Sequence, residues 1–131
     1  MRIRPIAILC ILAAPLRAEP PSARVLCDEH ADALFAALDE GRYEAAMADF
    51  EDGLRARYPA AKLRQDYESL PAKYGKLLGR GRPHDGDING HGIVMAPLIF
   101  ERGTVTAEVR CNGEGAISDV RLLPTQAMSA P

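Results

Sequence analysis

This sequence contains no tryptophan, few other aromatic residues and no surplus of basic ones. Its net charge of −2 excludes the basic surface by which proteins bind nucleic acid. The motifs of a nucleophile-elbow hydrolase, a zinc protease and a phosphate-binding loop are all missing, so these enzyme classes are excluded too. What is present is the ordinary composition of a globular protein, and a length of 131 residues fits one domain better than two.

The first residues have the pattern of an export signal. Two arginines precede a short apolar run at residues 6–14, which is too short to span a bilayer, and a small residue follows at Ala18. We expect residues 1–18 to be removed by cleavage after Ala18, with Ala14 as the alternative position. The chain that remains has 13 basic and 18 acidic residues. Its acidity disfavours contact with anionic membranes. The export signal leads us to expect a periplasmic or secreted protein.

Two cysteines, Cys27 and Cys111, remain after this cleavage, because Cys10 lies within the signal. An even number of cysteines in an oxidising compartment predicts a disulfide, with a pair of buried thiols as the alternative. The bridge would close a loop of more than 80 residues. On the chain-entropy model, a loop of that size stabilises a protein by roughly 4 kcal/mol.

Hydrophobic spacing predicts helices in the first part of the chain. Residues 24–40 carry apolar side chains three and four positions apart, and Gly41 follows as a stop. The same spacing recurs over residues 42–50 and 59–75, where Pro71 should kink or break the helix near residue 70. We therefore expect three helices, preceded by a flexible lead-in at residues 19–23.

After these helices the pattern changes to that of strands. We expect a polar loop at residues 83–91 and strands at residues 76–82, 93–100, 104–111 and 116–123. Pro97 indicates an edge or a bulge for its strand. Segregated helices and strands are typical of an α+β domain, with helices on one face of an antiparallel sheet of about four strands. The domain should span residues 24–124, with a loose tail at 125–131.

The stretch HDGDINGHG begins like a calcium-binding loop. Asp85, Asp87 and Asn89 offer oxygen ligands at alternate positions, and Gly90 follows them. The twelfth position of such a loop is Ala96, which has no oxygen in its side chain to close the site. We therefore interpret the stretch as a polar turn that binds no metal, with a weak calcium site as the alternative.

Two histidines, His84 and His91, bracket the same stretch. Together with Asp87 they could hold a transition metal, although their spacing matches no strong zinc motif. His30 lies at the border of the apolar stripe of the first helix, where a histidine is more often structural than catalytic. We expect neither a metal nor any other cofactor, and we assign no catalytic residue.

The continuous apolar run IVMAPLIF needs cover on both faces of its strand. One face should pack on the helices, and a ligand, a second subunit or the tail should cover the other. The candidate ligand-facing residues are Val94, Leu98 and Phe100 from this strand, with Tyr67 and Tyr74 from the third helix. This reasoning predicts a site for an unidentified protein or a small apolar ligand, and it allows for a homodimer.

Three long stretches carry a further pattern: ADALFAALDEGRYEAAMADF, RARYPAAKLRQDYESLPAKYGKL and PLIFERGTVTAEVRCNGEGAISDVRLLP. It resembles a family of small exported bacterial domains of unknown function, which also occur ahead of some α/β-hydrolase domains. The resemblance covers residues 28–124. It implies the cone-like fold of nuclear transport factor 2, in which a curved sheet wraps a long helix, and it brings no catalytic residues. Tyr67 stands where such domains often carry tryptophan, and Pro71 interrupts the same helix.

Together these observations predict an exported binding module without enzymatic activity. The first alternative is a small cone-fold isomerase or dehydratase that uses Asp49 with Tyr43, Tyr67 or Tyr74. The second is a structural domain stabilised by calcium. An enzyme pocket should bury a carboxyl group with a raised pKa beside a tyrosine, whereas a binding module should not.

Overall fold

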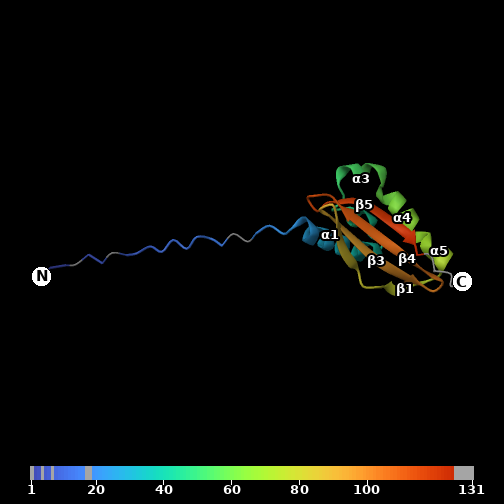
Figure 1. Ribbon diagram of the computed structural model, residues 1–131, viewed down its shortest axis with the longest axis horizontal. Coiled ribbons are helices and arrows are strands. Elements are labelled where there is room, and N and C mark those ends of the chain that lie inside the picture. The colour runs from blue at the N-terminus through green and yellow to red at the C-terminus, as the bar shows by residue number, and fades with distance from the viewer. Residues whose placement is uncertain (1, 4, 7, 17–18, 126–131) are drawn as a thin grey trace.

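A computed structural model describes residues 2–3, 5–6, 8–16 and 19–125. The predicted cleavage position after Ala18 and the predicted tail beyond Thr125 lie outside the described residues. From Ala23 onward, helices are followed by a curved, unclosed antiparallel sheet of five strands (Figure 1). The expected α+β class is confirmed, with one strand more than expected. No helix in the described part of the chain is long and apolar enough to cross a membrane.

The long first helix, α1 (Ala23–Asp39), packs mainly against the middle of the sheet. It begins where the Ser22 hydroxyl accepts a hydrogen bond from the backbone N–H of Val25, and Gly41 follows its end with a φ of 69°. The buried side chains of α1 recur at helical spacing and are Cys27, Ala31, Leu34, Phe35, Ala37 and Leu38. One apolar stripe of α1 therefore forms much of the core.

Four shorter helices follow: α2 (Tyr43–Ala46), α3 (Asp52–Arg57), α4 (Ala60–Glu68) and α5 (Leu70–Tyr74). The expected break near residue 70 is confirmed, because α4 ends at Glu68 and α5 starts at Leu70 with Pro71 in its first turn. Proline is tolerated in that turn because its missing N–H has no helical partner there. The short helix α3 was not predicted, since Leu54 is its only buried residue.

The strands are β1 (Leu77–Arg80), β2 (His84–Ile88), β3 (His91–Phe100), β4 (Gly103–Cys111) and β5 (Ile117–Pro124). All pairings are antiparallel. Strand β3 pairs with β4 on one side. On its other side the first half of β3 pairs with β2 and the last residues of β3 pair with β1. Strand β5 pairs with β4 and ends the sheet on that side.

The prediction of a loop over residues 83–91 was wrong, because β2 and β3 form a hairpin there. Asn89 and Gly90 both have positive φ, 54° and 82°, as the two central residues of a type I′ turn require. The Asp87 carboxylate accepts a hydrogen bond from the Gly90 N–H at 2.8 Å. An Asn-Gly pair favours this turn, so the sequence did contain the signal for the hairpin.

Of the two expectations for Pro97, an edge or a bulge, the edge position was wrong, because β3 has partners on both sides. An irregularity does occur in the pairing of β3 with β1, between Leu77 and Gly79. The Pro97 carbonyl accepts a hydrogen bond from the Gly81 N–H at 2.8 Å. The backbone of Pro97 therefore faces the place where β3 exchanges β2 for β1 as its partner. Few ladder hydrogen bonds exist at that junction, so the missing N–H of proline costs little.

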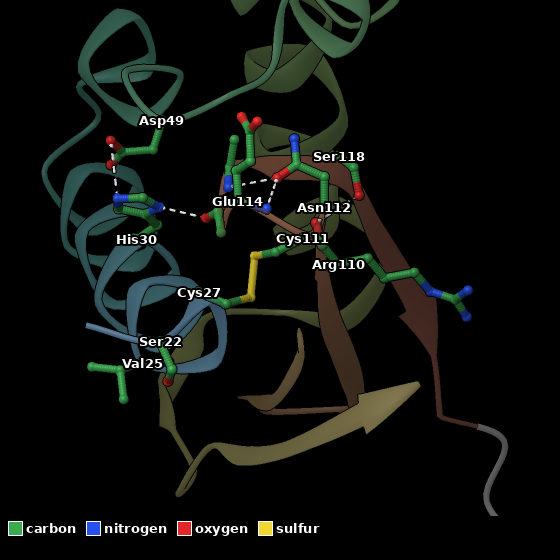
Figure 2. Close-up of a disulfide and its surroundings, with 12 residues drawn as sticks. Ser22, Val25, Cys27, His30, Asp49, Arg110, Cys111, Asn112, Glu114 and Ser118 are labelled. Carbon is green, nitrogen blue, oxygen red and sulfur yellow. Dashed lines mark hydrogen bonds and ion pairs between the residues drawn. A yellow bond between two sulfur atoms is a disulfide. The ribbon is translucent and has the colours of Figure 1, made fainter. Parts of the chain in front are cut away.

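The predicted disulfide is present. Cys27 of α1 and Cys111 of β4 are bonded, with 2.08 Å between the sulfur atoms, and both residues are buried (Figure 2). Gly92 of β3 lies directly beside the bridge, because a Cβ added to it would come within 2.9 Å of the Cys27 Cβ. The bridge thus ties the first helix to the sheet at a place where the two are in close contact.

Candidate functional site

The five predicted ligand-facing residues do not form one site. Val94, Leu98 and Phe100 point from β3 into the core beneath the helices, and none is more than 5% exposed. The Tyr74 ring packs on Phe100, with 5.9 Å between the ring centroids. These four residues hold the helices on the sheet, whereas Tyr67 lies apart from them in a cleft.

This cleft lies where the end of α1, the helix α4 and the edge strand β1 meet, and its volume is about 530 Å³. We call it the β1 cleft. It is lined by Leu38, Asp39, Tyr67, Leu77, Leu78, Gly79 and Arg80. Strand β1 is irregular between Leu77 and Gly79, and Leu78 at this irregularity is 63% exposed. The cleft therefore has an accessible apolar wall.

Tyr67 contributes a hydroxyl group that remains protonated. Burial raises the pKa of Tyr67, and the negative charge of Asp39 raises it further. The hydroxyls of Tyr43 and Tyr58 donate hydrogen bonds to carboxylates, whereas the Tyr67 hydroxyl has no hydrogen-bond partner among the described residues. It is available as a donor to a bound molecule.

Arg80 is the second polar group of the β1 cleft. Its Nη1 lies 2.8 Å from Oδ2 of Asp39, and its guanidinium carbon lies 5.1 Å from the centroid of the Phe35 ring. One carboxylate contact and one ring contact fix the guanidinium but use few of its five N–H groups. The cleft thus combines hydrogen-bond donors with an apolar wall. Its one carboxylate, Asp39, is already paired.

The sequence did not single out Asp39, Leu78 or Arg80. Asp39 is the last residue of α1, whereas Leu78 and Arg80 belong to the short strand β1. Only the packing of β1 beside α1 brings them together. The one available signal was the pair of adjacent leucines in a short strand, which places an apolar side chain on each face.

In the alternative calcium site, both candidate carboxylates have other partners. Oδ2 of Asp85 lies 3.0 Å from Nη2 of Arg24, and this guanidinium lowers the pKa of the Asp85 carboxyl. The Asp87 carboxylate accepts from Gly90, and Asn89 lies in the turn. Within residues 19–125 and the other described positions, no three His, Cys, Asp or Glu side chains gather as a metal site.

The alternative transition-metal site does not assemble. His84 is paired with Met95, whose side chain lies on the helix-free face of the sheet. Asp87 is paired with Gly92, which faces α1. Since side chains alternate along a strand, His84 and Asp87 point to opposite faces and cannot share an ion with His91.

His30 joins three segments that are distant in sequence (Figure 2). Its Nδ1 lies 2.7 Å from the Gly115 carbonyl oxygen, and its Nε2 lies 3.5 Å from Oδ1 of Asp49. Asn112 shapes the same loop, since its Oδ1 accepts from the N–H groups of Glu114 and Ala116. Both ring nitrogens of His30 face oxygen atoms of other segments. His30 therefore links α1 to the loop that contains Gly115 and to the segment of Asp49.

Asp28 lies at the opposite end of α1 from the β1 cleft. It lines a small cavity of about 230 Å³ with Asp32, Pro83, Asp85 and Val94. Burial raises the pKa of the Asp28 carboxyl, and the negative charge of Asp85 raises it further. No tyrosine lines this cavity.

Substitution of Asp28 by asparagine should raise the melting temperature at pH 7. Because the pKa of Asp28 is raised in the folded state, ionised Asp28 destabilises the fold at a pH above that pKa. Below the unfolded pKa of about 3.9 the carboxyl is protonated in both states, so this destabilisation is absent. The gain from Asp28→Asn should therefore shrink as the pH falls to 3. Thermal unfolding followed by circular dichroism at both pH values measures this, with Glu29→Gln on the exposed side of α1 as control. An equal gain at both pH values would contradict the electrostatic cause.

Comparison of the chain with protein-family models, with curated proteins and with solved structures finds no match. The α+β fold therefore stands on the structure alone. A function for the β1 cleft therefore has to be argued from the chemistry of its own residues.

Proposed function

We propose that this protein is an exported, non-catalytic binding domain whose β1 cleft holds a small amphipathic molecule. The carrying observation is the Tyr67 hydroxyl, which has no hydrogen-bond partner among the described residues. The half-buried Tyr67 shares the cleft with Arg80 and the exposed Leu78. Tyr67 and Arg80 offer donors, so the ligand should present a carbonyl or carboxylate acceptor. The leucine wall favours an apolar body.

Export is part of this proposal. It is supported by the arginine-led apolar run at the start of the sequence and by the Cys27–Cys111 disulfide, since such bonds persist in oxidising compartments. We also propose a cone-like fold of the nuclear transport factor 2 kind. The support is a curved antiparallel sheet that carries the long helix α1 on one face.

Two contacts favour binding over catalysis. Beside Tyr67, the Asp39 carboxylate is ion-paired with Arg80 and its side chain is 45% exposed, which does not suit a desolvated base. The carboxyl with the raised pKa, Asp28, lies in a different cavity. Asp49, the base expected for an isomerase, contacts His30.

Octanoate and 1-octanol are suitable probes, because they share an apolar body and differ in the head group. We expect octanoate to shift the NMR signals of the β1 cleft. Tyr67→Phe, which removes only the hydroxyl, should weaken octanoate binding roughly tenfold, the usual effect of losing one hydrogen bond to a charged group. Leu78→Ser should weaken both probes.

Ile99→Ser is the matched control, since Ile99 is an exposed apolar residue outside the cleft lining. It should leave both affinities unchanged. Equal losses from Leu78→Ser and Ile99→Ser would mean that the probes bind apolar surface without a site. Absence of binding by both probes would remove the amphipathic ligand from the proposal.

A further inference from the structure

Strand β5 ends the sheet, and the hydrogen-bond pattern shows which of its backbone groups face outward. The Thr125 N–H donates to the Thr104 carbonyl at 2.9 Å, in register with β4. Opposed residues of an antiparallel pair alternate between bonded and non-bonded positions. Leu123 and Arg121 therefore bond to β4. Val120 and Leu122 alternate with them along the strand, so their N–H and C=O groups point away from β4.

The outward-facing stretch is short because both of its ends are blocked. Ile117 bonds to the backbone of Asp49 and Glu51, and the Ser118 carbonyl accepts from Nη2 of Arg57 at 2.7 Å. At the other end Pro124 has no N–H to offer. Among the described residues, most of the β5 edge is thus closed and the backbone groups of Val120 and Leu122 have no partner.

A groove of about 370 Å³ runs along this open stretch, between β5 and the helices α4 and α5. We call it the β5-edge groove. It is lined by Tyr58, Asp66, Ser69, Leu70, Lys73, Val120, Arg121, Leu122 and Leu123. Four successive strand residues line one wall of the groove and helical side chains line the other, so the groove runs along the direction of β5.

The lining of the β5-edge groove defines the side chains that would fit. The Tyr58 hydroxyl donates to Asp66 at 2.7 Å, so that carboxylate is already engaged. Arg121 is ion-paired with Asp119 at 2.9 Å. Lys73 has no acidic partner among the described residues. Among the described residues Lys73 is therefore the basic group of the lining that has no ion-pair partner, and it lies beside apolar surface. Asp66 keeps its negative charge, because the Tyr58 hydroxyl that it accepts from is neutral.

We propose that the β5-edge groove binds an extended peptide segment as an added strand. Its backbone pairs with Val120 and Leu122, an acidic side chain lies at Lys73, and apolar side chains lie over Leu70. Strand addition of this kind obtains affinity from main-chain hydrogen bonds and specificity from alternate side chains. This peptide site is separate from the β1 cleft and does not depend on the ligand proposed there.

Amide hydrogen exchange on the full chain tests the open edge first. The amides of Val120 and Leu122 should exchange at least about tenfold faster than those of Arg121 and Leu123. Equal protection of all four amides would overturn the proposal. So would protection of Val120 and Leu122 that rises with protein concentration, because a second copy of the chain would then occupy the edge.

The peptide Thr-Val-Glu-Val-Thr-Val, with blocked ends, is the probe for the second step. It should slow exchange at Val120 and Leu122. Lys73→Glu should weaken its binding about three- to fivefold, as loss of an exposed ion pair does, and a peptide with lysine in place of glutamate should recover the loss. Leu122→Pro removes an outward N–H and should abolish binding while the chain stays folded. Unchanged affinity in both variants would place the peptide elsewhere.

Discussion

Replacement of Cys27 and Cys111 together by alanine should lower the free energy of unfolding by about 4 kcal/mol. The bridge joins residues 84 positions apart, so it removes much conformational freedom from the unfolded chain. It also links α1 to β4 within the core, where both cysteines are buried. Guanidinium unfolding followed by circular dichroism measures the change. The slope with denaturant should rise as well, because an unfolded chain without a cross-link exposes more surface.

The reduced natural sequence is the control for this experiment. It should unfold at the same denaturant concentration as the double alanine variant, since both lack the cross-link. A loss confined to the variant would assign the effect to packing of the sulfur atoms. A variant as stable as the oxidised protein would show that packing of α1 on the sheet is sufficient.

Gly115→Ala should cost about 3 kcal/mol, from left-handed backbone strain and from overpacking together. The φ of Gly115 is 84°, and an added Cβ would lie 2.6 Å from the Leu26 Cβ and 3.1 Å from the Ala23 carbonyl oxygen. Relief of this contact requires the loop to move away from α1. That movement would lengthen the 2.7 Å contact between His30 and the Gly115 carbonyl. The midpoint of denaturant unfolding measures the cost.

Gly113→Ala is the matched control, because Gly113 lies in the same loop. The nearest atom to an added Cβ there is His91 Nε2, 4.0 Å away. We expect its effect to stay within about 0.5 kcal/mol, as is usual for exposed positions. Similar losses for the two variants would mean that the loop is sensitive to any side chain, and would contradict tight docking on α1.

The elements that sequence predicted well are those with one buried face. In α1 the buried residues recur at helical spacing, and in β4 the alternation that puts Val105, Ala107 and Val109 inside is visible in the letters. Strand β2 was missed because its residues are mostly polar and exposed, so no such alternation exists. For β2 the better signal was the Asn89-Gly90 pair, because these two adjacent residues favour the turn that joins β2 to β3.

The candidate site was less predictable than the fold. The apolar run of β3 suggested a ligand on one face, but Val94, Leu98 and Phe100 are covered by the chain's own helices. On the opposite face Met95 and Ile99 are exposed, at 39% and 42%, which is common for single apolar residues on a surface. The β1 cleft depends on contacts between distant segments, which no local pattern encodes.

The disulfide has a consequence for the order of folding. Strands β2 to β5 follow one another along the chain, so the sheet forms through short loop closures, which are fast. In the folded protein Cys27 meets Cys111 through the docking of α1 on that sheet, although 84 positions separate the two residues. Oxidation of the two thiols during refolding therefore reports the docking of the first helix on the sheet.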